Sequence, residues 1–136
     1  MCHMFEKVTG RKTIGNVEGL KTLLLKHILQ KDKHAIIQVP VEYLEIDTRY
    51  QTDERTERDL QYLTKNWSER KLLPLVGVPH WNEGKIYIVD GYGRWIASQI
   101  VDPVKYKYLD VLVLLDAPED PIERLKFEAE EYAYQN

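Results

Sequence analysis

The sequence predicts a small α/β (α+β) domain in which helices flank a mixed β-sheet. Segments with helical apolar periodicity alternate along the chain with short runs rich in β-branched and aromatic residues. A turn that contains asparagine and glycine joins two of these runs as a hairpin. The length of 136 residues, with no linker, repeat or low-complexity stretch, suits a single domain over residues 1–136.

The amino-terminal third is expected to form one helix and one strand. The helix covers residues 16–31, with Asn16 as its cap and four apolar residues at helical spacing: Val17, Leu20, Leu24 and Ile28. Three further leucines widen its apolar face, which indicates a second contact surface, such as another subunit: Leu23, Leu25 and Leu29. Residues 34–39 form a strand that ends at Pro40, and an extended or turning segment follows. The amino terminus, Met1 to Met4, is expected to be mobile, and this is favoured over a soft-metal site at these residues.

The middle of the chain predicts a helix and a hairpin. A polar stretch leads into a helix from about residue 54 to 70, whose apolar stripe is Leu60, Leu63 and Trp67. Two strands, 72–81 and 85–90, flank a turn that contains Asn82 and Gly84. Apolar residues at successive positions 86–89 indicate that the second strand is covered on both faces.

The last third predicts a helix, a strand and a helix. The first helix begins near residue 92, directly after the hairpin, and a buried strand covers residues 108–116. The final helix covers residues 119–134, with Glu119 or Asp120 at its positive end. Four of its residues share one apolar face: Ile122, Leu125, Ala129 and Tyr132.

Composition excludes several classes of protein. No apolar run approaches the roughly 18 residues that span a bilayer, and the amino terminus has no signal-peptide pattern, so we expect a cytoplasmic protein without membrane contact. Cys2 is the only cysteine, which excludes an intramolecular disulfide. The net charge of −3 argues against a surface that coats a polyanion, so any contact with nucleic acid must be local.

The segment IYIVDGYGRWIASQI carries the candidate site. A strand that ends at Asp90 and turns directly into a helix leaves the first backbone N–H groups of that helix without acceptors. Gly91 and Gly93, on either side of Tyr92, let another group approach the backbone, and Arg94 adds a guanidinium suited to phosphate. Asp90 has three candidate roles: to cap the turn, to hold Arg94 or to meet a metal ion on the phosphates. The alternative is a plain turn with a surface arginine.

The same segment also carries a resemblance to a known family. VDGYGRWIAS, preceded by LLPLVGVPHWNEGKIYI and by YLEIDTRYQTDERTERDLQYLTKNW, resembles the ParB-like N-terminal domains of the ParB and sulfiredoxin superfamily. The resemblance covers about residues 36–115, and the helices at 16–31 and 119–134 are additions to it. The last helix is similar to that of phage-type relatives. The matching positions are Tyr50, Gln51, Leu60 to Trp67, Pro74 to Val78, Gly84, Asp90, Gly91, Arg94 and Ala97.

The resemblance implies a nucleotide partner and a role as a switch or DNA-associated module of a partition or phage-type system, with any contact to DNA indirect. The implied ligand is a nucleoside triphosphate, CTP or ATP, with Mg²⁺. It would lie on the loop and helix start at Asp90, Gly91, Tyr92, Gly93 and Arg94, with Gln51 and Arg49 on the opposite wall.

The chain departs from the family pattern at several positions. Tyr92 and Gly93 replace the glutamate and arginine of partition proteins, and Ile96 replaces a further arginine. Tyr92 also stands where sulfiredoxins have cysteine, which excludes their thiolate chemistry. Thr52 and Asp53 stand where relatives have arginine after the glutamine; Arg49, Arg55 and Arg58 are candidates to compensate.

Two other functions stay open at this stage. The first is an enzyme, a metal-dependent nuclease or a nucleotide-using phosphotransferase or NTPase, with Asp90 as candidate catalytic residue beside Asp47 or Glu54. The second is a non-catalytic interaction domain with a decayed pocket that forms a homodimer through the first predicted helix. The four histidines are not spaced as metal ligands, so no metal site is expected.

Overall fold

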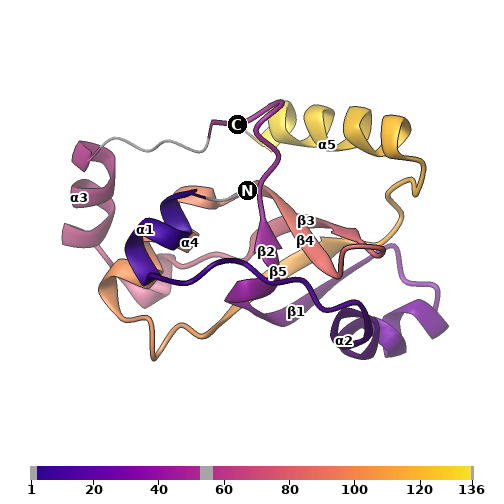
Figure 1. Ribbon diagram of the computed structural model, residues 1–136, viewed down its shortest axis with the longest axis horizontal. Coiled ribbons are helices and arrows are strands. Elements are labelled where there is room, and N and C mark those ends of the chain that lie inside the picture. The colour runs from indigo at the N-terminus through magenta and orange to yellow at the C-terminus, as the bar shows by residue number, and fades with distance from the viewer. Residues whose placement is uncertain (1–2, 53–56, 136) are drawn as a thin grey trace.

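The computed structural model describes residues 3–52 and 57–135, with His3 and Lys71 described by their backbone alone. Its centre is a five-stranded mixed sheet in the order β1-β5-β3-β4-β2, with helices on both faces (Figure 1). The prediction of a mixed sheet flanked by helices is therefore confirmed.

The sheet combines antiparallel and parallel pairs. β1 (His34–Pro40) pairs antiparallel with β5 (Tyr108–Leu114), which runs parallel to β3 (Leu75–His80). β3 and β4 (Lys85–Asp90) form the expected hairpin, and β4 runs parallel to the two-residue β2 (Leu44–Glu45). Because β2 and β4 are parallel, the residues after β2 lie at the same end of the strands as the residues after β4. This arrangement brings two separate segments of the chain to the candidate site.

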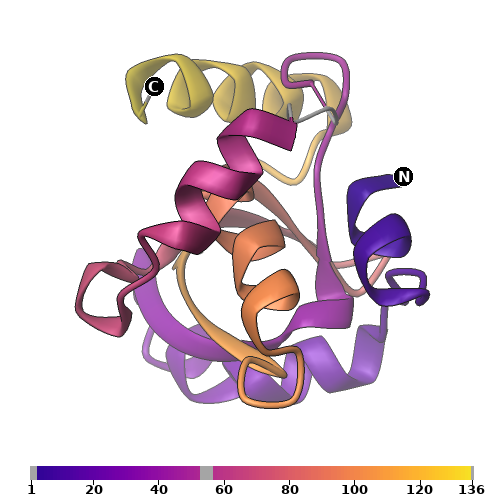
Figure 2. The ribbon, with the colours of Figure 1, turned by 90° about the vertical axis from the view of Figure 1, so that its left-hand side faces the viewer.

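The larger core lies on one face of the sheet. It joins buried side chains from α1 (His3–Thr9), α2 (Val17–Leu29), α3 (Glu57–Lys65) and α4 (Tyr92–Val101) to those of the strands. α3 packs on α4, which Figure 2 shows from the side. α5 (Pro121–Gln135) lies on the opposite face, where it covers a smaller cluster with Phe127 and Tyr132 (Figures 1 and 2). β4 is thus covered on both faces, as predicted.

The amino terminus differs from the expectation of a mobile segment. Residues His3–Thr9 form α1, and the Phe5 side chain is completely buried in the main core. Its ring centroid lies 5.3 Å from that of Trp95 in α4. A helix of seven residues is too short to show a period in the sequence, and the contact with Trp95 stabilises it instead.

The second predicted helix, residues 54–70, is longer than the helix in the structure. α3 ends at Lys65, and a short 3₁₀ helix follows at Glu69–Lys71; residues 54–56 of the prediction lie outside the described residues. The Nδ2 amide of Asn66 donates 2.9 Å to the Tyr62 carbonyl at the helix end. Trp67 leaves the helix direction and donates its indole N–H, at 3.1 Å, to the Tyr106 hydroxyl. A long-range contact therefore ends the helix earlier than the apolar stripe indicates.

Three predicted apolar surfaces are also wrong in part. Ile28 on α2 is 40% exposed, and Ile122 on α5 is 67% exposed, so neither belongs to a buried face. β5 alternates between buried and more exposed residues, because the face on which Tyr108 and Asp110 lie is not fully covered. The predicted cap residues are confirmed: Asn16 accepts from the Gly19 amide at 2.7 Å, and Asp120 accepts from the Glu123 amide at 3.0 Å.

Candidate phosphate-binding site

The junction between β4 and α4 needs glycine at position 91. Gly91 has φ of +97°, a left-handed conformation that residues with a side chain rarely adopt. A Cβ there would also lie 2.4 Å from Leu75 Cδ2 and 2.8 Å from the Arg94 Nη2 atom. As N-cap of α4, Gly91 provides no side-chain hydrogen bond to the helix start, and the first turn holds no acidic residue. Gly91, which has no side chain, therefore gives no side-chain acceptor to the positive end of α4.

Arg94 lies across this junction with part of its donor capacity unused. Its Nη2 atom is 3.3 Å from the Pro74 carbonyl and 3.5 Å from Asp90 Oδ2, both long for hydrogen bonds to a guanidinium. Its Nε atom is buried and has no hydrogen-bond partner among the described residues. A buried donor without an acceptor is costly, so an anion at this position would stabilise Arg94. Holding Arg94 is one of the three roles expected for Asp90.

A small pocket of about 160 Å³ borders Arg94 on the side of α3. Its lining includes Trp67 and Leu72 from the segment after α3, and it is mainly apolar. None of the residues 90–93 lines it. Among residues 90–94, Arg94 alone lines this apolar pocket.

Gln51 is brought to the same strand as the junction. Its side chain is buried, and its Nε2 amide donates 2.7 Å to the carbonyl of Ile88, three residues before Gly91. Tyr92 is buried at the start of α4, whereas Gly91, Gly93 and Arg94 are partly exposed. The junction residues and Gln51 thus share one end of β4.

The Arg49 side chain pairs with Asp47. Its guanidinium forms a fork on Asp47, with Nε 2.9 Å from Oδ1 and Nη2 2.6 Å from Oδ2, and its side chain is 64% exposed. Burial alone would raise the pKa of Asp47, but the hydrogen bonds from Arg49 and the positive charges of Arg49 and His80 lower it below its ordinary value. Arg49 is therefore committed to Asp47 in this structure.

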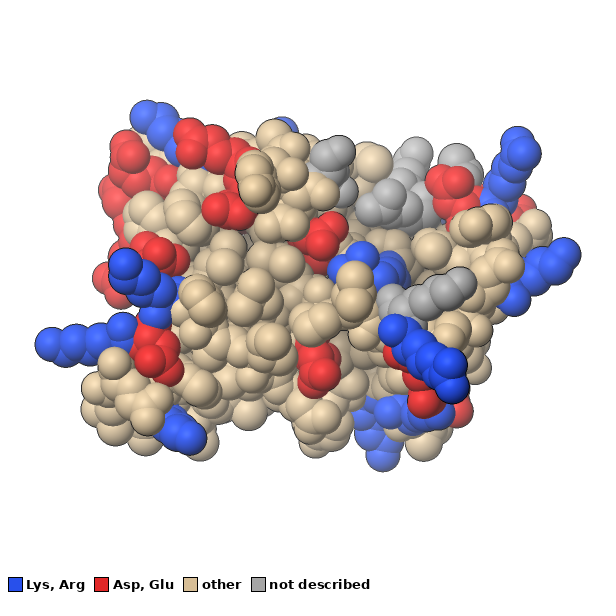
Figure 3. Space-filling view, turned by 180° about the vertical axis from the view of Figure 1, so that it is seen from behind, with Lys and Arg blue, Asp and Glu red and all other residues tan. Residues whose placement is uncertain are grey.

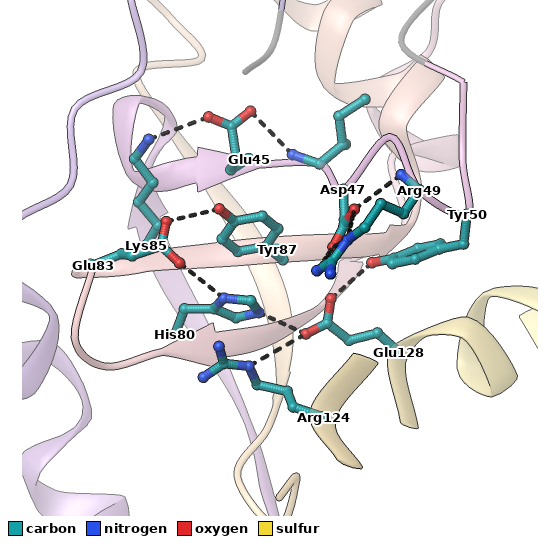
Figure 4. A network of polar contacts seen from close by, with 11 residues as sticks. Glu45, Asp47, Arg49, Tyr50, His80, Glu83, Lys85, Tyr87, Arg124 and Glu128 are labelled. Atoms are coloured by element: carbon teal, nitrogen blue, oxygen red, sulfur yellow. Dashed lines mark hydrogen bonds and ion pairs between the residues drawn. The ribbon is translucent and has the colours of Figure 1, made fainter. Parts of the chain in front are cut away.

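A polar network that the sequence analysis did not identify lies beside Arg49 (Figure 4). His80 places Nε2 2.6 Å from Glu128 Oε2 and Nδ1 3.1 Å from Glu83 Oε2. The Tyr50 hydroxyl donates 2.9 Å to Glu128, and burial together with the Glu128 charge raises the pKa of Tyr50. Burial raises the pKa of Tyr87 as well, helped by its hydrogen bond to Glu83. The sequence gives no pattern for the contacts of Glu128, because Tyr50 and His80 are 78 and 48 positions away from it in the chain.

The candidate metal ligands do not meet in the part of the chain that the structure describes. Among the side chains that the structure describes, no three of His, Cys, Asp or Glu gather as a metal site. Asp47 contacts Arg49, and Asp90 contacts Arg94. Asp53, Glu54 and Arg55 lie outside the described residues.

The surface is consistent with the charge pattern of the sequence. The face in Figure 3 carries acidic and basic side chains around a largely uncharged centre, with no continuous basic area. Among the described residues, none of the helices has the length and apolar character to cross a membrane.

Comparison with known proteins shows a likeness in fold to a solved structure. No protein-family model and no curated protein matches the sequence. Among solved structures, the fold is similar to that of the C-terminally truncated chromosome-partitioning protein ParB from Caulobacter crescentus, complexed with CTP-γ-S. The TM-score is 0.54 and the identity 22%, over 75% of this chain and 54% of the ParB chain. This chain thus spans about half the length of that protein. At this identity the likeness concerns the fold, and the chain has a ParB-like fold.

Proposed function

We propose that this chain is a ParB-like domain that binds a nucleoside triphosphate, CTP or ATP, with the phosphates at the start of α4. The observation that carries the proposal is the buried Nε donor of Arg94, which has no hydrogen-bond partner among the described residues, beside a helix whose N-cap, Gly91, has no side chain to cap it. The ParB protein of similar fold is complexed with a CTP analogue, which supports the same ligand class here.

Each residue of the junction has a distinct role in this proposal. Gly91 sets the left-handed turn into α4, and Gly93, without a side chain, leaves room for phosphate oxygens to approach the backbone amides of the first helical turn. Tyr92 has a buried side chain, so it offers only its backbone to the ligand. Arg94 turns from its two long contacts to the phosphate, where its planar fork pairs two oxygens. Asp90, released by Arg94, would be available to hold a Mg²⁺ ion that accompanies the phosphates.

Gln51 and Arg49 complete the site from the segment after β2. The Gln51 side chain is already hydrogen-bonded to the Ile88 carbonyl of β4, so it borders the ligand without a large movement. Arg49 is on the same loop with a side chain that is 64% exposed, and it reaches a phosphate if it leaves Asp47. Arg49 therefore contacts the phosphates after Arg94 does, and it contributes less to the binding free energy.

The test is a calorimetric titration with CTP, ATP and GTP in the presence of Mg²⁺. We expect one triphosphate to bind and Arg94→Ala to weaken its affinity at least about tenfold, because a charge-assisted hydrogen bond is removed. Arg94→Lys keeps the charge without the fork and should give an intermediate loss. Lys126→Ala removes an exposed cation from α5 and should leave the affinity unchanged. Absence of binding by every triphosphate would refute the proposal.

We further propose that the domain acts as a switch or DNA-associated module of a partition or phage-type system, with residues 1–136 as one unit and DNA contacted indirectly. A binding role is favoured over nuclease or NTPase activity, because Asp90 and Asp47 each face an arginine. Magnesium-dependent cleavage of DNA or release of phosphate that Asp90→Asn abolishes would reverse this preference. Sedimentation with and without nucleotide tests the homodimer.

A further inference from the structure

Glu128 is an almost completely buried carboxylate that joins α5 to two other parts of the fold. Only 1% of the residue is exposed. Its Oε1 atom accepts from the Tyr50 hydroxyl at 2.9 Å, and its Oε2 atom lies 2.6 Å from His80 Nε2. Arg124, one turn earlier on α5, places Nε 3.9 Å from Oε2. A buried carboxylate with this many partners has one well-defined position.

His80 fixes that position relative to the sheet. It lies at the end of β3 and is almost fully buried. Its ring stacks on Tyr87 of the neighbouring strand, with centroids 3.8 Å apart and planes 20° apart, and its second nitrogen faces Glu83 in the hairpin turn. Figure 4 shows Glu128 between this ring and the Tyr50 ring. The carboxylate is thus held by the rigid hairpin, and it in turn holds Tyr50.

Tyr50 precedes Gln51, the buried residue beside the candidate phosphate site. The Tyr50 ring packs against Tyr132 of α5, with centroids 5.5 Å apart, so α5 holds this residue by its ring and by its hydroxyl. Gln51 itself is bound to the Ile88 carbonyl. The loop therefore has two anchors in succession, one on α5 and one on β4.

We propose that Glu128 is a positioning residue: through the Tyr50 hydroxyl it holds the loop that carries Arg49 and Gln51 against the end of β4, in the geometry that the phosphate site requires. Glu128 does not touch the ligand. The inference rests on the nucleotide-binding function proposed above, and it adds that α5, on the opposite face of the sheet from most of the core, determines the affinity of that site.

The decisive variant is Tyr50→Phe, which removes the hydroxyl and keeps the ring against Tyr132. Tyr87→Phe is the matched control, because it removes a hydroxyl that donates to Glu83 in the same network without touching Glu128. We expect Tyr50→Phe to weaken nucleotide affinity about threefold to tenfold, the equivalent of one net hydrogen bond, and to speed amide exchange in residues 46–52. Tyr87→Phe should change neither quantity.

Glu128→Gln and the double variant separate positioning from general stability. If the Tyr50 hydroxyl transmits the effect, Glu128→Gln weakens binding in the wild-type background but adds little in the Tyr50→Phe background. A purely structural role would lower the melting temperature of each variant and leave the affinity well below that temperature unchanged, which would overturn the inference.

The two proposals fail in different ways. If the wild-type chain binds no triphosphate, the proposed function is refuted, while amide exchange in residues 46–52 still reports whether Glu128 holds the loop. If the wild-type chain binds and Tyr50→Phe binds equally well with unchanged exchange, the nucleotide site stands and the positioning role of Glu128 is refuted.

Discussion

His80 Nε2 lies 2.6 Å from Glu128 Oε2, and the side chains are 5% and 1% exposed. This contact ties the last helix to the central hairpin. Because a carboxylate accepts, and His80 also faces Glu83 through its other nitrogen, both contacts are hydrogen bonds only when each ring nitrogen carries a proton.

Replacement of His80 should destabilise the protein strongly. We expect His80→Ala to lower the free energy of unfolding by about 3 kcal/mol, because it leaves the buried Glu128 carboxylate without its partner at 2.6 Å. Urea denaturation followed by circular dichroism measures the change. His34→Ala, at an exposed position on β1, should stay within about 0.5 kcal/mol of wild type. Similar midpoints for the two variants would contradict the structural role given to His80.

Stability should fall in acid through Asp47 and Glu83. Burial opposes ionisation of both carboxyls, but hydrogen bonds from Arg49 to Asp47, and from Tyr87 and His80 to Glu83, hold their pKa values below the ordinary 3.8 and 4.5. A lowered pKa in the folded state stabilises it above the unfolded value, and this stabilisation is lost as the pH falls through the folded value.

Asp47→Asn tests this pH dependence. At pH 7 the variant should be less stable than wild type by about 1.5–3 kcal/mol, the range for hydrogen bonds to charged groups. The difference should shrink steadily below about pH 4, where the wild-type carboxylate also becomes protonated. Urea midpoints at pH 7, 5, 4 and 3 follow it, and a difference that is constant with pH would show that ionisation of Asp47 is irrelevant.

Gly91→Ala should harm both stability and the phosphate site. The new Cβ adopts a strained φ and meets Leu75 and Arg94 at less than 3 Å, so we expect a cost of more than about 2 kcal/mol and a displaced Arg94. Gly10→Ala is the control: its φ is +72°, but no atom lies within 4 Å of its Cβ, so it should cost only the backbone strain of about 1 kcal/mol. Equal losses for both variants would remove the packing argument at the junction.

Phe5→Ala tests whether the first helix belongs to the core. Deletion of a completely buried ring against Trp95 should cost about 3–5 kcal/mol. Lys7→Ala, exposed on the same helix, should be nearly neutral. A neutral Phe5→Ala, measured by thermal and urea unfolding, would mean that α1 is not needed for the fold.

Local patterns in the sequence were sufficient for the features that depend on neighbouring residues. The hairpin follows from Gly84 in the turn, the start of α2 from the Asn16 cap, and the β4–α4 junction from Gly91. Each depends on backbone conformation or on hydrogen bonds within a few positions, which a single sequence records directly.

The tertiary structure alone decided the features that join distant residues. α1 is stabilised by the contact between the rings of Phe5 and Trp95. α3 ends early because the Trp67 indole donates a hydrogen bond to the Tyr106 hydroxyl. The burial of Glu128 has no local signal, since its partners Tyr50 and His80 are 78 and 48 positions away. Such contacts stabilise the protein through desolvation and pairing that exist only after the chain has folded. Periodicity along the sequence therefore cannot predict them.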